Sequence, residues 1–312
     1  MKIGIFTVVF AGTRIEEVLK YVKKHGCEMA EIGTGNFPGN AHCPTDLLLK
    51  KPAELEKYKK MMADSGLKIS ALSCHGNPLH PNKKIAKEHR QGFRKAVELA
   101  ERLGVDRVVC FSGCPGDNDK ASYPNWVIAA WPGEHVELLK WQWEKKIIPY
   151  WEEEVKFARQ HGINKICLEM HPAFAVYNPH TLLRLRDAVG ETIGANFDPS
   201  HLFWQGIDPV VAVKHLGAAI YHVHAKDTKI NPATTAVNGV LDTTPYSEVS
   251  ARSWGFRTVG DGHDDSFWKD FIKALQSVGY DYVLSIEHED PLLGINEGFE
   301  KAAAFLKGII TK

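Results

Sequence analysis

The chain has 312 residues, and its 38 basic and 38 acidic side chains give a formal net charge of zero at pH 7. That length allows one large domain or two ordinary ones, and a balanced charge without a Lys/Arg stripe argues against nucleic-acid binding. Six scattered cysteines without a CxxC pair favour buried, reduced thiols over disulfides.

The first predicted element is a β-strand over 2–8, with the sequence KIGIFTV. Its apolar start resembles a signal peptide, but it lacks a small-residue cleavage site, and an amphipathic helix over 13–26 follows at once. No apolar run approaches the roughly 20 residues that span a bilayer. We therefore predict a protein of the cytoplasm that does not associate with membranes.

Seven further units follow, each with a helix, a turn that contains glycine, and a short apolar run typical of a β-strand. A helix C-terminus needs a residue of positive φ at such a turn, and the glycines placed there are Gly26, Gly66, Gly104, Gly162, Gly190, Gly217 and Gly279. Strands that alternate with helices predict parallel βαβ units. Eight of them predict an α/β fold, a closed (β/α)8 TIM barrel that forms a single domain over 1–312. A doubly wound open sheet is the alternative, but no GxGxxG follows the first strand.

Two predicted loops are long. The longest, about 225–264, shows no sustained helical period, and loops of this length are usually functional. The loop at 112–135 carries Tyr123, Trp126 and Trp131. Such aromatic side chains suit the C–H face of a sugar ring, although core packing or a subunit interface would use them equally well.

Four consecutive predicted strands end on acidic or imidazole side chains. They are Glu169 in CLEMHP, Asp198 in NFDPSH, His224 in HVHAKD and Glu287 in SIEHEDP. The chemistry of such barrels lies at these strand ends, and buried charges require a partner or a metal. Three carboxylates and one imidazole suit Mn²⁺, Mg²⁺ or Co²⁺, with Zn²⁺ also compatible. Isolated ion pairs or helix caps are the alternative, but four matching positions favour one shared site.

These four segments, together with GDGHDDSFW at 260–268, resemble the xylose-isomerase-like TIM-barrel group. That group includes sugar phosphate isomerases and epimerases, ketose 3-epimerases, inosose dehydratases and endonuclease IV. The resemblance covers essentially the whole barrel and is densest from 164 to 290. In the epimerase branch it implies that Glu169, Asp198, His224 and Glu287 bind one divalent metal ion, with Mn²⁺ as the first choice.

The resemblance also implies that Glu169 and Glu287 face each other across the substrate and exchange its proton. The chemistry supports this independently, because a metal that chelates a carbonyl oxygen and its neighbouring hydroxyl acidifies the C–H between them. One carboxylate within reach can then remove the proton, and another can return it.

Further residues are candidates for contact with the substrate. They are His75, His171, His201, Lys226, Arg257 and Trp204. The resemblance implies that His201 contacts a substrate hydroxyl and that Arg257 reaches sugar oxygens. His171 shares the strand parity of Glu169 and is expected to point into the barrel mouth. The alternatives are histidines that orient a neighbouring carboxylate, a solvated arginine and aromatic packing.

Two more polar residues are expected to have structural roles. His222 shares the parity of His224 but lies one step deeper, so we expect it to fill a layer of the barrel. Asp227 follows the seventh strand and is expected to hold the long loop in place.

An endonuclease IV-like zinc nuclease is one competing interpretation. The chain keeps His75, Asp261 and His263 at matching motif positions, but it has no histidine after the fourth strand, in VVCFSGCPGD. The net charge of zero also argues against binding to the phosphate backbone of a nucleic acid. A non-enzymatic sugar-binding barrel is a second competitor, and no sequence feature supports it.

The leading prediction is a metal-dependent isomerase or epimerase of a keto- or aldo-sugar. The alternative is a lyase or dehydratase that acts on an inosose or a 3-oxo-glycoside, with C- or O-deglycosylation. Both begin with metal-assisted proton abstraction next to a carbonyl. No glycine-rich phosphate cradle is evident, so an unphosphorylated substrate is as compatible as a phosphorylated one. The expected partner is a small sugar, and a homo-oligomer or a small partner subunit stays open.

Overall fold

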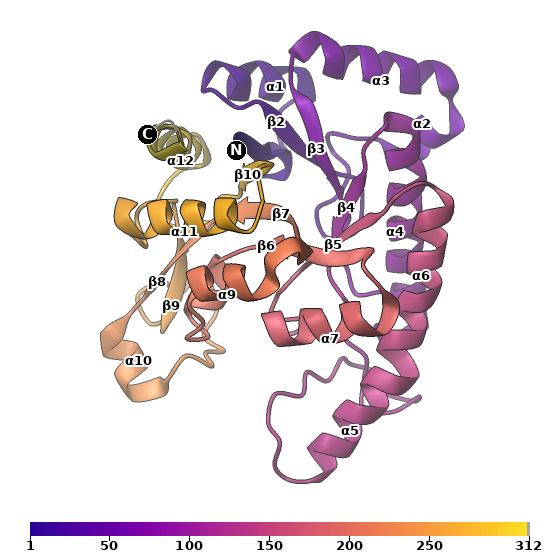
Figure 1. Ribbon diagram of the computed structural model, residues 1–312, viewed down its shortest axis with the longest axis vertical. Helices are drawn as coiled ribbons and strands as arrows, with labels where there is room; N and C mark the ends of the chain where they lie inside the picture. The colour runs from indigo at the N-terminus through magenta and orange to yellow at the C-terminus, as the bar shows by residue number, and fades with distance from the viewer. Residues whose placement is uncertain (311–312) are drawn as a thin grey trace. The chain divides into compact units, whose positions relative to one another are not determined.

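The computed structural model describes residues 1–310 (Figure 1). Its eight parallel strands follow the order β1-β10-β7-β6-β5-β4-β3-β2 in a closed barrel, so the predicted (β/α)8 fold is confirmed and the open sheet is wrong. The strands are β1 Lys2–Phe6, β2 Met29–Gly33, β3 Lys68–Ser73, β4 Arg107–Cys110, β5 Lys165–Glu169, β6 Ile193–Phe197, β7 Ile220–Ala225 and β10 Val283–Ile286.

Helices connect the strands, as the repeating units predict. They are α1 Ile15–Lys24, α2 Thr45–Lys50, α3 Pro52–Ser65, α4 Lys83–Leu103, α5 Glu134–Gln142, α6 Ile148–Gln160, α7 Pro179–Val189, α8 Ser200–Phe203, α9 Pro209–Leu216, α10 Pro232–Asn238, α11 Asp265–Ser277 and α12 Ile295–Ile310. The seven predicted turn glycines all have positive φ. Gly104, for example, ends α4 with φ 69° and ψ 30°, a left-handed conformation that side chains disfavour.

The chain divides into two compact units. The first unit comprises 1–31, 62–68 and 197–312. In it β1 pairs with both β2 and β10, and β10 pairs with β7. The helices of this unit cover the strands with apolar side chains, and Phe10, Tyr21 and Phe299 meet with ring centroids 5.6–5.7 Å apart.

The second unit comprises 32–61 and 69–196. Strands β3, β4, β5 and β6 pair in that order. Glu154 of α6 is fully buried, and it is tolerated there because the Nε atoms of Arg90 and Arg94 on α4 lie 2.6 and 3.0 Å from its carboxylate oxygens. These ion pairs connect α4 with α6.

The segment predicted as one irregular loop, 225–264, contains regular structure. Strand β8 (Asp227–Ile230) pairs antiparallel with β9 (Trp254–Arg257), and α10 follows β8 (Figure 1). The expectation of a loop without helix is therefore wrong. The prediction failed because these elements are short: strands of four residues and a helix of seven give too few repeats for a period to be recognised.

All six cysteines are reduced and buried, as predicted. Burial raises the pKa of Cys27, Cys43 and Cys114 to about 12, so these thiols stay protonated at neutral pH. Among the helices of residues 1–310, none combines the length and the apolar composition needed to cross a bilayer.

Candidate metal and substrate site

Three of the four predicted metal ligands lie together in the first unit. His224 is on β7, Glu287 follows β10, and the two strands pair so that the Glu287 N–H donates to the carbonyl of Ala225. The Nδ1 atom of His224 lies 3.2 Å from Oε2 of Glu287. Asp198 follows β6, and both Asp198 and His224 are fully buried.

Lys226 lies among the carboxylates of this unit. Its Nζ is 2.7 Å from Glu289, 3.1 Å from Glu287 and 3.7 Å from Asp198, and it is 4.3 Å from the ring centroid of Phe256. One ammonium and three carboxylates carry a net charge of −2 while the imidazoles are neutral. This excess of negative charge suits a divalent cation, and the carboxylate oxygens and imidazole nitrogens are donor atoms that can bind one.

His201 lies next to Asp198, three residues further along the chain. Its Nε2 is 3.3 Å from Oδ2 of Asp198, while Oδ1 of Asp198 accepts a hydrogen bond from the Ser200 N–H at 2.8 Å. The His201 ring meets the Phe256 ring edge-on at 5.5 Å. This arrangement agrees with the alternative in which the histidine orients its neighbouring carboxylate, and contact with a substrate stays a prediction.

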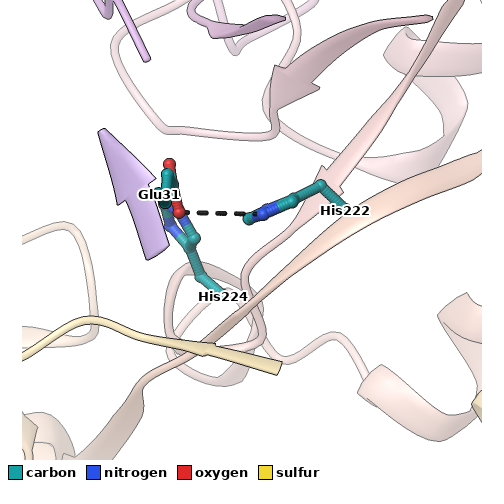
Figure 2. Close-up of side chains that lie close together, drawn as sticks. All are labelled: Glu31, His222 and His224. Carbon is teal, nitrogen blue, oxygen red and sulfur yellow. Dashed lines mark hydrogen bonds and ion pairs between the residues drawn. The ribbon is translucent and has the colours of Figure 1, made fainter. Parts of the chain in front are cut away.

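A carboxylate that was not predicted as a site residue contacts His224. Glu31, on β2, is fully buried, and its Oε2 lies 2.9 Å from Nε2 of His224 and 3.8 Å from Nε2 of His222. Figure 2 shows both imidazoles directed at this carboxylate. The sequence did contain a signal for this residue, because Glu31 is an acidic residue inside an otherwise apolar strand. His222 thus fills the barrel layer, as predicted, but with a charged neighbour.

Glu169 is held by two side chains of the second unit. Its Oε2 lies 3.0 Å from Nε2 of His75, which follows β3, and accepts a hydrogen bond at 3.0 Å from the Asn196 amide of β6. His75 and Glu169 are 4% and 3% exposed. His75 was a predicted site residue, whereas Asn196 was not, because nothing in the sequence indicates its register opposite Glu169.

An aromatic wall, formed by Phe111 and Phe174, lies beside His75. The Phe111 ring lies 4.6 Å from the His75 ring and stacks on Phe174 at 4.2 Å. His171 contacts the same ring at 4.9 Å and donates from Nδ1 to the carbonyl of Pro172. Ala173 has φ 71°, an unfavourable value for alanine. This wall was not predicted from the sequence.

Arg257 and Trp204 belong to the surroundings of the β8–β9 ribbon. Arg257 donates to the carbonyl of Phe256, lies 3.8 Å from Asp290 and lines a cavity of about 630 Å³ with Trp254. Trp204 is 6% exposed and stacks on Trp254 with ring centroids 4.6 Å apart. Trp204 therefore matches the packing alternative, and a contact between Trp204 and substrate stays a prediction.

Asp227 holds the long excursion between β7 and α11, as expected. Its carboxylate accepts hydrogen bonds from the N–H of Gly260 and of His263, from Nδ1 of His263 at 2.7 Å and from the Trp268 indole at 3.2 Å. Asp261 pairs with Lys301 instead. Asp261 and His263, two of the three motif positions that match nucleases, are thus used in structural contacts.

Comparison with known proteins gives one family. The family profile described as "Xylose isomerase-like TIM barrel" matches residues 19–309. A Bacillus subtilis (strain 168) protein, "Uncharacterized protein YfiH", is 37% identical over 314 residues, which cover 100% of both chains.

Solved structures share the fold. A D-tagatose 3-epimerase-like protein superimposes with a TM-score of 0.68 at 21% identity, covering 100% of this chain and 97% of the other. The probable 3-DHS dehydratase AsbF from Bacillus anthracis gives 0.70 at 16% identity, covering 98% and 99%. The IOLI protein with a binding zinc atom gives 0.68 at 19%, covering 100% and 98%. At these identities the likeness establishes a common fold.

Proposed function

Because this chain belongs to the xylose isomerase-like TIM-barrel family, we propose that it is a divalent-metal-dependent sugar isomerase or epimerase. The observation that carries the proposal is the group formed by the fully buried Asp198 and His224 and the partly buried Glu287, in which the carboxylates around Lys226 exceed the positive charge. Such an excess inside a protein is costly unless a cation balances it.

In this proposal Glu169, Asp198, His224 and Glu287 hold one metal ion. Their strands β5, β6, β7 and β10 are consecutive in the sheet order, which supports a shared site. Mn²⁺ is the first choice, and Mg²⁺, Co²⁺ and Zn²⁺ suit the same donors. When bound, the metal supplies Lewis acidity toward a substrate carbonyl.

Glu169 and Glu287 exchange the proton of the carbon next to the carbonyl. His75 and Asn196 fix the orientation of the Glu169 carboxylate through its Oε2. The Lys226 ammonium lies 3.1 Å from the Glu287 carboxylate and offsets part of its negative charge. His171, His201, Lys226 and Arg257 are proposed to contact substrate oxygens.

A lyase that acts on an inosose or a 3-oxo-glycoside is the second candidate. The aromatic wall of Phe111 and Phe174 beside His75 favours it, because such a surface suits the apolar face of a leaving group. The first step is unchanged, and the leaving group departs from the carbon next to the carbanion. Released leaving group would identify this reaction.

The reduced state of all six cysteines supports the further proposal that the protein works in the cytoplasm. A small sugar is the proposed partner. The balanced charge supports the absence of a nucleic-acid partner, and assembly as a homo-oligomer or with a small subunit stays a prediction.

The first experiment is metal analysis by mass spectrometry of protein purified without chelators or metal-affinity resin. We expect about one divalent ion per chain, and Glu287→Gln should lose most of it. Glu289→Gln is the matched control, because it removes a charge beside Lys226 but no proposed ligand, and it should keep its metal. Wild-type protein that takes up no metal on reconstitution would contradict the proposal.

The second experiment follows turnover of candidate keto-sugars in D₂O by NMR. We expect deuterium at the carbon next to the carbonyl, and we expect Glu169→Gln and Glu287→Gln to lower kcat by at least about 100-fold, the usual contribution of general acid–base groups. Near-normal turnover in both variants would remove them from the proton transfer.

A further inference from the structure

Glu31 is a charged side chain enclosed by the interior of the first unit. It is fully buried, and so are its neighbours His222, His224 and Ser285. The Ser285 hydroxyl donates to Oε2 of Glu31 at 2.7 Å, and Nε2 of His224 lies 2.9 Å from Oε2 and 3.1 Å from Oε1. A buried carboxylate is tolerated only where such donors surround it.

The strand register explains how these residues meet. Glu31 is paired with Phe6 of β1, while Ser285 of β10 is paired with His224 of β7. Phe6 also stacks on the His224 ring at 5.6 Å with an interplanar angle of 25°. The His224 ring is therefore held on its face by Phe6 and at its Nε2 edge by Glu31.

The contacts of His224 decide which ring nitrogen carries the proton. An ionised carboxylate only accepts hydrogen bonds, so the Nε2 that faces both oxygens of Glu31 must be the protonated nitrogen. In a neutral imidazole the other nitrogen then carries the lone pair. That nitrogen is Nδ1, the atom 3.2 Å from Glu287.

We propose that Glu31 is the positioning residue of His224, which it fixes as the Nε2–H tautomer with the Nδ1 lone pair directed toward the proposed metal site. The part that concerns metal binding rests on the proposed function, whereas the tautomer does not. Carboxylates that accept from a metal-bound histidine orient the ring and raise its basicity as a ligand.

A second metal ion between Glu31, His222 and His224 is the competing explanation. Their ligand atoms lie within 4.8 Å of one another (Figure 2). However, Ser285 and His224 already approach Oε2 at hydrogen-bond distances of 2.7 and 2.9 Å, whereas tetrahedral zinc ligands at roughly 2 Å would lie about 3.3 Å apart. The hydrogen-bonded arrangement fits the distances better.

The first test needs no variant. Metal-free wild-type protein labelled with ¹⁵N-histidine is studied by two-dimensional ¹H–¹⁵N NMR at a pH where the ring is neutral, and His224 is assigned from the signals that His224→Asn loses. We expect the Nε2–H tautomer for His224. The Nδ1–H tautomer would overturn the proposal whatever the function of the protein.

The second test measures Co²⁺ affinity by competition with a chelator. Glu31→Gln keeps the shape of the side chain, but its amide can turn to offer a donor, so it no longer enforces the tautomer. We expect Co²⁺ binding to weaken roughly 10- to 100-fold, with an altered visible spectrum of the bound ion. Glu154→Gln is the control, since it makes the same change at a buried carboxylate of the second unit, and it should bind Co²⁺ as wild type does.

The outcomes are distinguishable. Unchanged Co²⁺ affinity in Glu31→Gln, or two ions per wild-type chain of which Glu31→Gln loses one, would overturn the positioning role. Wild-type protein that binds no Co²⁺ would instead contradict the proposed function, and the tautomer measured in the metal-free protein would still decide the role of Glu31.

Discussion

Lys226 is a buried cation whose neighbours are the carboxylates of Asp198, Glu287 and Glu289. It partly balances a site that, in the proposed function, also holds a divalent ion. Its positive charge therefore has opposite effects on the two states of the protein. It stabilises the fold without metal, and it opposes the metal through like-charge repulsion.

Lys226→Met should therefore destabilise the metal-free protein by roughly 3 kcal/mol or more, because removing one partner of a buried ion pair leaves the other charges uncompensated. The rise in melting temperature on adding Mn²⁺ should be larger than in wild type. Calorimetry with and without Mn²⁺ measures both effects. An equal or smaller rise in the variant would show that Lys226 does not compete with the ion.

Asp106, in the second unit, connects stability to pH through its ion pairs with Arg107 and Lys165. Partial burial raises the pKa of Asp106, but hydrogen bonds from Arg107 and Lys165 outweigh burial and lower the pKa from 3.8 to about 2. Because the folded pKa lies below the unfolded one, the stabilisation is complete above the unfolded value and is lost as pH falls through the folded value.

Asp106→Asn should destabilise the protein at pH 7 by on the order of 1 kcal/mol, a figure discounted because the side chain is half exposed. The difference from wild type should narrow as pH falls from 5 toward 3. Urea unfolding at several pH values measures it. A difference that does not change with pH would rule out the ion-pair explanation.

The positions of single residues were predictable where they follow from the end of a strand. Glu169, Asp198, His224 and Glu287 stand out because each ends or follows an apolar strand, and parallel strands bring such ends to one edge of a sheet. Glu31 is different. Its role depends on Ser285 and His224, more than 190 residues away along the chain, and no local pattern specifies those contacts.

At the scale of elements, the helix–turn–strand units were predictable because their signals are local. In each of the seven units a glycine of positive φ lies at the turn after the helix, and an apolar run begins the next strand. The β8–β9 ribbon was not predictable, because its four-residue strands are defined by pairing with each other and by packing of Trp254 and Phe256 against Trp204.

Trp254→Ala should therefore loosen the ribbon. The indole stacks on Trp204 at 4.6 Å and donates to the carbonyl of Val240 at 3.1 Å, so its loss removes both packing and a hydrogen bond. We expect a local cost of about 3–5 kcal/mol, typical of removing a buried tryptophan. Hydrogen exchange should accelerate at the amides of β8 and β9 and stay unchanged in β4 and β5. Uniform acceleration over all strands would show that the ribbon is not an independent element.

At the scale of the whole molecule, the barrel could be predicted by counting eight strand signals, because no other arrangement of that many βαβ units fits the pattern as well.

The burial of the thiols also concerns the whole molecule. Each of the six cysteines lies inside the packed interior of its unit, and burial raises the pKa of those at 27, 43 and 114 to about 12.

The native protein should therefore resist thiol reagents at pH 8. We expect labelling by iodoacetamide at fewer than one site per chain in buffer and at all six sites in guanidinium, as read by intact mass. Rapid labelling of one cysteine in buffer would show that its surroundings open on the timescale of the reaction.

The Asp227 carboxylate holds both ends of the long excursion between β7 and α11. It joins the residue where the excursion leaves the barrel to Gly260 and His263, where the chain returns. Both ends are thus closed by one side chain, whatever lies between them. We therefore expect the segment to tolerate changes of length and sequence between its two ends without a change in the register of the surrounding strands.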